Sequence, residues 1–341
     1  MKPSCLALYA VLLSTAIAVP ALAASSGYHV LKSVTLGGDG GFDYLNMDPA
    51  TGYLWITRGN HLMVVDVDAG KVLKDITGLM GIHGTAFVGG KAYVSEGGAN
   101  KVSVFDSKSF AKLSEAATGT GPDGIMYDDA SKRVFAFNGR SGDATAIDVA
   151  TGKPAGNVAL GGKPEAASSD GAGTIFTNVE NKNELVAFDA KTLAVKGHYA
   201  LTGCESPSGQ AMDVAHSRIF AVCDGGVMTV TDAKSGKVVT TVKIGDGPDA
   251  ARFDPASGLI FASNGGSGTI TIVHEDGPDK YTVLDNVETA KGARTMELDP
   301  KSHRLFVVSS VMNPAPAATA DNPRPRPTVV PGSFRLIVLG R

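Results

Sequence analysis

The chain repeats itself about every forty residues from Phe42 to its C-terminus. A hydrophobic run that ends in Asp and then turns marks the phase of the repeat. The marks are separated by 40, 42, 41 and 43 residues and fall at Asp66, Asp106, Asp148, Asp189 and Asp232. A period of this length matches one supersecondary unit of four short strands, which cannot bury both faces alone and stacks on copies of itself. The repeat therefore predicts an all-β fold of stacked units.

Each repeat contains four predicted antiparallel strands, named a to d in chain order. The a–b turns carry Asp, which accepts backbone N–H groups, and Pro, which presets φ, as in Asp48–Gly52, Asp254–Gly258 and Asp299–Ser302. The b strands that follow are rich in β-branched and aromatic residues, as in 53–57 and 259–263. Strand a starts seven times, near residues 42, 82, 123, 165, 208, 249 and 294. The count predicts seven blades.

The last repeat supplies strands a, b and c (Phe334–Leu339) but ends before a strand d. The missing strand is available at Tyr28–Leu36, which precedes the first a strand. Pairing it with the C-terminal strand closes the ring and removes two exposed edges. We therefore predict a single domain over residues 24–341, a seven-bladed β-propeller closed by N-terminal strand pairing with the last blade.

The first 23 residues have the pattern of a signal peptide. Lys2 is followed by an apolar run (Leu6–Val19), by Pro20 and by a small-x-small site at Ala21–Ala23. Cleavage after Ala23 would leave 318 residues. No later stretch approaches the roughly 20 apolar residues that a membrane span needs. We expect a periplasmic or secreted protein with no membrane span.

The charge balance argues against a nucleic-acid partner. Loss of residues 1–23 removes Lys2 and no acid, so the formal net charge falls from −3 to −4. Nucleic-acid surfaces usually show as a basic patch, and aromatic residues, at 6%, offer few platforms for stacking bases. We expect a monomer whose partner is a small polar ligand or another protein.

Residues 310–333, between strands b and c of the last blade, depart from the repeat. They contain six prolines and predict an extended, polyproline-like excursion. Two interpretations remain open, a solvated long loop or a lid over one mouth of the channel.

The repeats resemble the YVTN-type β-propeller proteins, and among them the exported YncE-like group. The resemblance covers essentially the whole mature chain and rests on the Asp-Pro-x-Ser/Thr-Gly turns and on the b strands that end in Asn138, Asn178 and Asn264. The literal Tyr-Val-Thr-Asn string is absent, and Ala-Phe-Asn and Ala-Ser-Asn stand in its place. The resemblance implies a seven-bladed propeller outside the cytoplasm and no established reaction. The Gly-His and Trp-Asp signatures of WD repeats are missing.

Alignment of the repeats picks out one position at the start of each innermost strand. It lies five residues before the a–b turn, and its occupants should surround one mouth of the central channel; we call them the mouth ring. The ring consists of Asp43, His83, Asp123, Glu165, Ser208, Asp249 and Arg294.

A second aligned position lies at the ends of the b strands, which should reach the same face. We call its occupants the second ring, and they are Arg58, Glu96, Asn138, Asn178, Cys223, Asn264 and Ser309.

Two interpretations of the acids remain open. Asp in the Gly-Pro-Asp segments at 121–123 and 247–249 can cap a tight turn by accepting backbone N–H groups. Alternatively, the acids and His83 form a polar ligand site or hold a hard cation through oxygen ligands, which Asn carbonyls also suit. Arg58 and Arg294 would offset the acids or clamp an anionic group of a ligand. His83 is either a structural hydrogen-bonding residue or a ligand or base.

Cys204 and Cys223 are the only cysteines after residue 23 and are expected on the same face of blade five. In an exported protein, two such cysteines predict a disulfide; a metal-binding or redox pair is the alternative.

No catalytic motif is present. The sequence lacks a Gly-x-Ser-x-Gly elbow, a phosphate-binding glycine loop and a His-Glu-x-x-His pair. We therefore predict a non-catalytic scaffold that binds a ligand or protein through the channel-mouth face. The alternative is a metal-assisted hydrolase or lactonase in which Glu165, Asp249, Asn138, Asn178 and Asn264 hold a divalent ion that activates water. We expect no cofactor, with a divalent cation as the open alternative.

Overall fold

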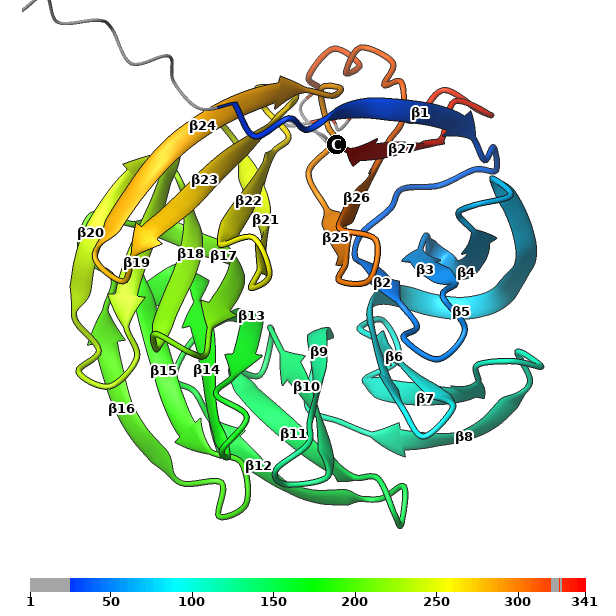
Figure 1. Ribbon diagram of the computed structural model, residues 1–341. Coiled ribbons are helices and arrows are strands. Elements are labelled where there is room, and N and C mark those ends of the chain that lie inside the picture. Colours follow the sequence, from blue (N-terminus) through cyan, green and yellow to red (C-terminus); the bar gives the residue numbers. More distant parts are fainter. Residues whose placement is uncertain (1–24, 320–324, 326) are drawn as a thin grey trace, which may run out of the picture.

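A computed structural model describes residues 25–319, 325 and 327–341 of the chain. They form seven antiparallel blades around a central axis (Figure 1), which confirms the predicted all-β propeller. The predicted signal peptide, residues 1–23, lies outside the described residues. No helix in the described ranges is long and apolar enough to cross a membrane.

The strands follow the predicted order. Blades one and two comprise β2 (Leu45–Met47), β3 (Leu54–Thr57), β4 (Gly59–Asp66), β5 (Lys71–Val88), β6 (Lys91–Glu96), β7 (Lys101–Asp106) and β8 (Lys112–Ala117). Blades three and four comprise β9 (Pro122–Asp128), β10 (Arg133–Asn138), β11 (Asp143–Asp148), β12 (Pro154–Ala159), β13 (Pro164–Ser169), β14 (Thr174–Val179), the 3-10 helix η1 (Glu180–Lys182), β15 (Glu184–Asp189) and β16 (Val195–Ala200). Blades five and six comprise β17 (Glu205–Asp213), β18 (Arg218–Asp224), β19 (Val227–Asp232), β20 (Val238–Lys243), β21 (Pro248–Asp254), β22 (Leu259–Asn264), β23 (Thr269–Gly277) and β24 (Lys280–Glu288). Blade seven comprises β25 (Met296–Asp299), β26 (Arg304–Ser309), β27 (Arg335–Gly340) and β1 (His29–Thr35).

Blades one and two share the long strand β5. Its first part pairs with β4, from Asp66 opposite Lys71, and its last part pairs with β6, to Val88 opposite Lys91. β5 therefore serves as strand d of blade one and strand a of blade two. The seven-stranded sheet that runs from β2 to β8 is in effect two four-stranded blades.

The two ends of the chain close the ring as predicted. β1 pairs antiparallel with β27, with His29 opposite Gly340 and Thr35 opposite Arg335, so that blade seven has the order β1-β27-β26-β25. This pairing covers the hydrogen-bonding edge that the last repeat would otherwise expose.

The hydrophobic core lies between neighbouring blades. Among the described residues, seven apolar clusters each join two adjacent blades. At the closing interface, Phe306 and Leu336 of blade seven are fully buried against Leu45 and Ile56 of blade one. Each blade thus buries both faces against its neighbours, as the repeat requires.

The aspartates that mark the repeat are turn caps. Oδ1 of Asp106 accepts the backbone N–H groups of Lys108 (3.1 Å) and Ser109 (2.7 Å), and Asp232 makes the same bonds in blade five. These bonds lower the pKa of Asp106, most strongly through Ser109. The regular spacing of these residues therefore has a structural cause.

The base of the Pro-rich segment is paired rather than wholly extended. Met312 and Val329 form an isolated antiparallel bridge, and the Asn313 N–H donates to the Thr328 carbonyl at 2.8 Å. A hollow of about 510 Å³ lies between this base and Asp39–Gly41, in the connection between β1 and β2. A lid over the channel remains a prediction.

Candidate functional site

The innermost strands of the blades lie around the central axis (Figure 1), and short distances link five residues of the mouth ring: Asp43, His83, Asp123, Asp249 and Arg294. Three ring residues from adjacent blades, Asp43, His83 and Asp123, are in close contact. His83 Nδ1 lies 2.7 Å from Oδ2 of Asp43 and 3.7 Å from Oδ1 of Asp123. One ligand atom from each of the three lies within 4.8 Å of the others, a spacing that suits a bound metal ion.

Arg294 lies between two acids of the ring, Asp43 and Asp249. Its NH2 atom is 3.8 Å from Oδ1 of Asp43, and its Nε atom is 3.5 Å from Oδ2 of Asp249. The Arg294 side chain is 47% exposed, so these long contacts contribute little stability.

Lys163, which occupies neither aligned position of the repeat, also belongs to the site. Lys163 Nζ lies 2.6 Å from Oε1 of Glu165 and also bonds Glu180. Glu180 follows strand β14, so it approaches from the b–c side of the same blade. Because neither Lys163 nor Glu180 occupies the aligned positions, comparison of the repeats missed them; a charged residue in a d–a turn was the available signal.

The ring carboxylates are not turn caps. Among the described residues, no backbone N–H group donates to a side-chain oxygen of Asp43, Asp123, Glu165 or Asp249, in contrast to the aspartates of the a–b and c–d turns. Burial raises the pKa of Asp123 to about 6, and the nearby Asp43 adds to the shift while His83 opposes it. The acids therefore crowd together without enough positive charge between them.

The other ring groups respond to the same crowding. Burial raises the pKa of Glu165, the charge of Asp123 raises it further, and Lys163 opposes the shift. Burial also raises the pKa of Asp249. Burial lowers the pKa of His83, but its hydrogen bond to Asp43 and the charges of Asp123, Asp43 and Glu165 raise it by more, so the net shift is upward. A positive charge added at the mouth would relieve this repulsion.

Hydroxyl groups of neighbouring blades hold the ring backbone in place. Thr57 Oγ1 donates to the His83 carbonyl at 2.5 Å, Ser95 Oγ donates to the Asp123 carbonyl at 2.6 Å, and Ser263 Oγ bonds the Arg294 carbonyl. Each hydroxyl lies one residue before the second ring on strand b of the preceding blade. These bonds fix the backbone of the three ring residues relative to the preceding blade.

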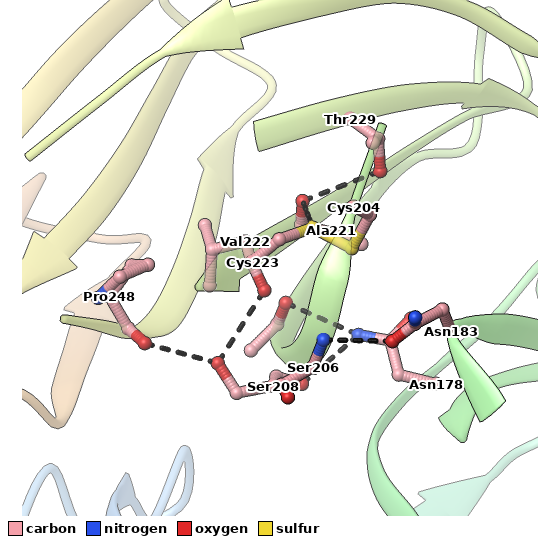
Figure 2. Close-up of a disulfide and its surroundings, with 11 residues drawn as sticks. Asn178, Asn183, Cys204, Ser206, Ser208, Ala221, Val222, Cys223, Thr229 and Pro248 are labelled. Atoms are coloured by element: carbon pink, nitrogen blue, oxygen red, sulfur yellow. Dashed lines mark hydrogen bonds between the residues drawn. A yellow bond between two sulfur atoms is a disulfide. The ribbon is translucent and has the colours of Figure 1, made fainter. Parts of the chain in front are cut away.

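Ser208 is positioned by a disulfide and an amide (Figure 2). Cys204 and Cys223 are bonded, as predicted, with their Cα atoms 5.3 Å apart. Asn178 Nδ2 donates to the Ser208 carbonyl at 3.0 Å, while Ser208 Oγ donates to the Pro248 carbonyl at 3.2 Å. The Ser208 side chain therefore bonds the next blade, and it adds no charge to the mouth.

The charged residues of the second ring are structural. Arg58 is fully buried, donates to the carbonyls of Gly37, Asp39, Gly40 and Gly41, and stacks 3.6 Å from the centre of the Phe334 ring. Glu96 is 2% exposed and bonds the Met80 N–H group and the Ser103 hydroxyl.

The asparagines of the second ring are also buried. Asn138 Nδ2 donates to Asp143 and Thr145, and Asn264 Nδ2 makes the equivalent bonds to Thr269 and Thr271. Both side chains are 0% exposed. They stabilise the b–c turns from inside the blades. Ser309 is 1% exposed, and its hydroxyl donates to the Lys291 carbonyl in the connection between β24 and β25. We therefore confine the candidate site to the mouth ring and its lysine.

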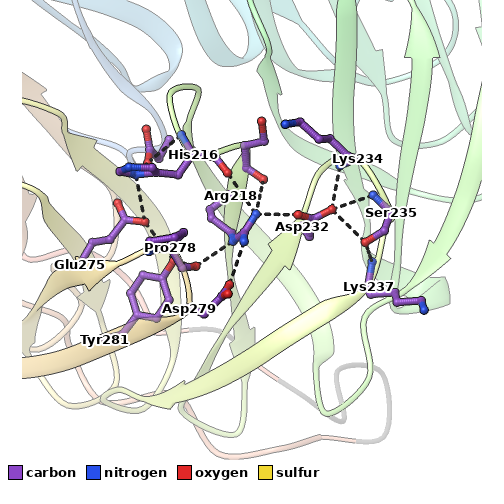
Figure 3. A network of polar contacts seen from close by, with 12 residues as sticks. His216, Arg218, Asp232, Lys234, Ser235, Lys237, Glu275, Pro278, Asp279 and Tyr281 are labelled. Carbon is purple, nitrogen blue, oxygen red and sulfur yellow. Dashed lines mark hydrogen bonds and ion pairs between the residues drawn. The ribbon is translucent and has the colours of Figure 1, made fainter.

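A second polar cluster lies between the a–b turn of blade five and strand β23 of blade six (Figure 3). His216 Nδ1 is 2.6 Å from Oδ2 of Asp213 and 3.6 Å from Oε1 of Glu275. Asp213 also caps its own turn by accepting the Ala215 N–H group. Beside this cluster, Arg218 bonds Asp232 and Asp279 and so ties blade five to the β23–β24 hairpin. These contacts explain the cluster as a clamp between blades.

No protein-family model matches the sequence, and no curated protein matches it. Solved structures are similar in fold. A chain of the mitotic checkpoint complex is 13% identical, with 98% of this chain and 99% of that chain covered and a TM-score of 0.74. The WD40 repeats of RRP9 are 10% identical, with 94% and 99% covered and a TM-score of 0.72. Hydrazine synthase from Kuenenia stuttgartiensis is 16% identical, with 80% and 93% covered and a TM-score of 0.68. At these identities the likeness shows the β-propeller fold alone.

Proposed function

We propose that this chain is an exported, non-catalytic binding propeller of the YVTN type, near the YncE-like group, that takes a small positively charged ligand at its channel mouth. The observation that carries the proposal is the convergence of Asp43, Asp123, Glu165 and Asp249 without capping bonds. Like charges that are partly buried together cost folding free energy, and such costs concentrate at functional sites.

Export is proposed on two features of the chain. The first is the signal-peptide pattern of residues 1–23. The second is the disulfide between Cys204 and Cys223, since disulfides persist in oxidising compartments and are rare in the cytosol.

A cation-binding test separates this proposal from its alternatives. The probes are calcium chloride, zinc chloride and ethanolamine, titrated by calorimetry into EDTA-treated protein at pH 8, with sodium acetate as the anionic control. We expect at least one cation to bind and to lose at least tenfold in affinity in D123N, whereas acetate does not bind. Equal binding of acetate, or no binding of any cation, would overturn the proposal.

A metal-assisted hydrolase or lactonase is the second candidate, because Asp43, His83 and Asp123 can present three ligand atoms to one ion. This set replaces the asparagines expected from the sequence. The amides of Asn138 and Asn264 bond inside their own blades, and the amide of Asn178 bonds the Ser208 carbonyl of the next blade. Under this alternative, purified protein carries stoichiometric divalent metal, melts at lower temperature after chelation and hydrolyses a lactone. Substoichiometric metal with no melting shift excludes it.

A further inference from the structure

We infer that the ligand of the mouth is a short organic amine whose carbon chain enters a chamber directly below the mouth ring and ends in a hydrogen-bond donor. The inference rests on the proposed function and adds the class of the ligand. The chamber is a cavity of about 260 Å³ inside the channel. Its lining residues include those that directly follow the ring residues on strands β5, β9 and β13, namely Gly84, Gly124 and Ala166. The chamber therefore begins one residue below the ring on these strands.

Tyr44 connects the ring to the chamber. It directly follows Asp43 at an aligned position that other blades fill with Gly, Ala or Thr, and it lines the chamber. Burial raises its pKa well above the usual value, and the charges of Asp123 and Glu165 contribute. The phenol therefore stays protonated and lies within electrostatic reach of the mouth acids.

A buried amide oxygen of the chamber wall lacks a partner. Gln210 on β17 is 5% exposed and lines the chamber. Its Nε2 atom donates to the Phe176 carbonyl at 3.2 Å, which leaves Oε1 as the free end. Within the described part of the chain, Oε1 is buried without a hydrogen bond. An unsatisfied buried acceptor costs about 1–3 kcal/mol, so this atom calls for a donor from a ligand or a water molecule.

The chamber's own positive charge is already neutralised. Arg252 Nε and NH2 lie 3.1 Å and 2.8 Å from the same oxygen of Glu297. Burial raises the pKa of Glu297 while Arg252 opposes the shift. With Arg252 paired and four carboxylates at the mouth, an anionic ligand is disfavoured throughout, and a donor is favoured at Gln210.

Asn46 also lines the wall, with its Oδ1 accepting the Thr85 N–H group, and the remaining side chains are apolar. Ile125, Met126, Phe137 and Ala167 line it. A bare metal ion gains nothing from such a wall, whereas methylene groups gain about 0.8 kcal/mol each on burial. A water occupies about 30 Å³ of liquid, so the cavity has room for an aliphatic chain of several carbons. The combination selects an amine with a short carbon chain and a terminal hydroxyl or similar donor.

Calorimetry at pH 8 with amino alcohols of two to six carbons tests the inference, with calcium chloride as a probe of the mouth alone. Wild-type protein should gain about fourfold in affinity per added methylene, which corresponds to about 0.8 kcal/mol, until the chamber is full. An n-alkylamine matched in length should bind less tightly than the amino alcohol. The variant A166M, which fills the chamber, should abolish the dependence of affinity on chain length. A172M, at an exposed turn of the same blade, is the matched control.

The measurements distinguish a failure of the proposed cation binding from a failure of the inference about the chamber. If no cation binds and D123N changes nothing, the proposed function is wrong. If cations bind through Asp123 but affinity is independent of chain length and of the terminal hydroxyl, the chamber holds only water and the inference is wrong. The wild-type length series decides this point even if A166M does not fold.

Discussion

The Nδ1 atom of His83 lies 2.7 Å from Oδ2 of Asp43, a residue one full repeat of 40 positions earlier in the chain. Asp123, one repeat later, lies 3.7 Å from the same nitrogen. Three copies of one structural position thus form a single carboxylate–imidazole–carboxylate contact. A repeat with identical residues at this position would set like charges together; the different residues at the aligned position create the site.

Replacement of Asp123 by Asn should stabilise the protein at pH 8. Its folded-state pKa of about 6, against an ordinary 3.8, means that the folded state holds this proton more tightly than the unfolded state. Stability is therefore lost as pH rises from about 4 to 6, and the penalty is complete above that range. We expect D123N to raise the free energy of unfolding by about 1–3 kcal/mol at pH 8 and by almost nothing at pH 4, measured by urea denaturation.

The exposed E288Q on the outer strand β24 is the matched control and should change stability by less than about 0.5 kcal/mol at either pH. Since D123N should also weaken ligand binding, it would show that the acid is kept at a cost in stability. A D123N protein that is less stable at pH 8 would contradict the assigned crowding.

Replacement of His83 by Gln should have the opposite dependence on pH. The raised pKa of His83 means that its charged form stabilises the folded state fully below the unfolded pKa near 6.5, and that this stability is lost as pH rises through the higher folded pKa. H83Q should cost about 1–2 kcal/mol at pH 6 and less at pH 9. Chemical denaturation at both pH values measures the difference, with the exposed H29Q as control. A loss that grows with pH would show that neutral His83 is the stabilising form.

Replacement of Arg58 by Ala should destabilise the fold strongly. The side chain is fully buried, and its loss leaves four carbonyls of residues 37–41 without their donor. Because truncation of this large buried side chain leaves a cavity and removes its packing against Phe334, we expect a total loss of about 3–5 kcal/mol. R58K should also lose stability, since an ammonium group cannot reproduce the planar guanidinium geometry. The exposed R140A is the control. If R58A kept full stability but lost cation binding, Arg58 would belong to the site after all.

Arg58 also shows why the repeat predicts some parts of the site and not others. The seven blades, the strand that closes the ring and the convergence of the mouth ring all follow from the repeat, because equivalent positions occupy equivalent places. The partners of Arg58 lie in the connection between β1 and β2, which has no counterpart in other blades. No alignment of repeats can reveal such a contact.

The asparagines of the second ring show a different limit. Their place at the end of strand b was predicted, but whether an amide turns toward the channel or into its own b–c turn depends on local partners such as Thr145 and Thr271. Gln210 is the reverse case. It lies on an innermost strand two residues after Ser208, and only the three-dimensional arrangement shows that its amide oxygen is buried at the chamber without a partner.

Loss of the disulfide should loosen one segment of the mouth before it unfolds the propeller. The bond joins residues separated by 19 positions, and chain entropy for a loop of this length predicts a loss of about 3 kcal/mol in C204S/C223S. Strand β17 has two register shifts, between Glu205 and Pro207 and between Pro207 and Gln210, so fewer ladder bonds hold it there. Hydrogen exchange should therefore rise first over residues 205–210. Wild-type protein reduced with dithiothreitol should match the variant; uniform exchange across all seven blades would instead mean that the disulfide stabilises only the global fold.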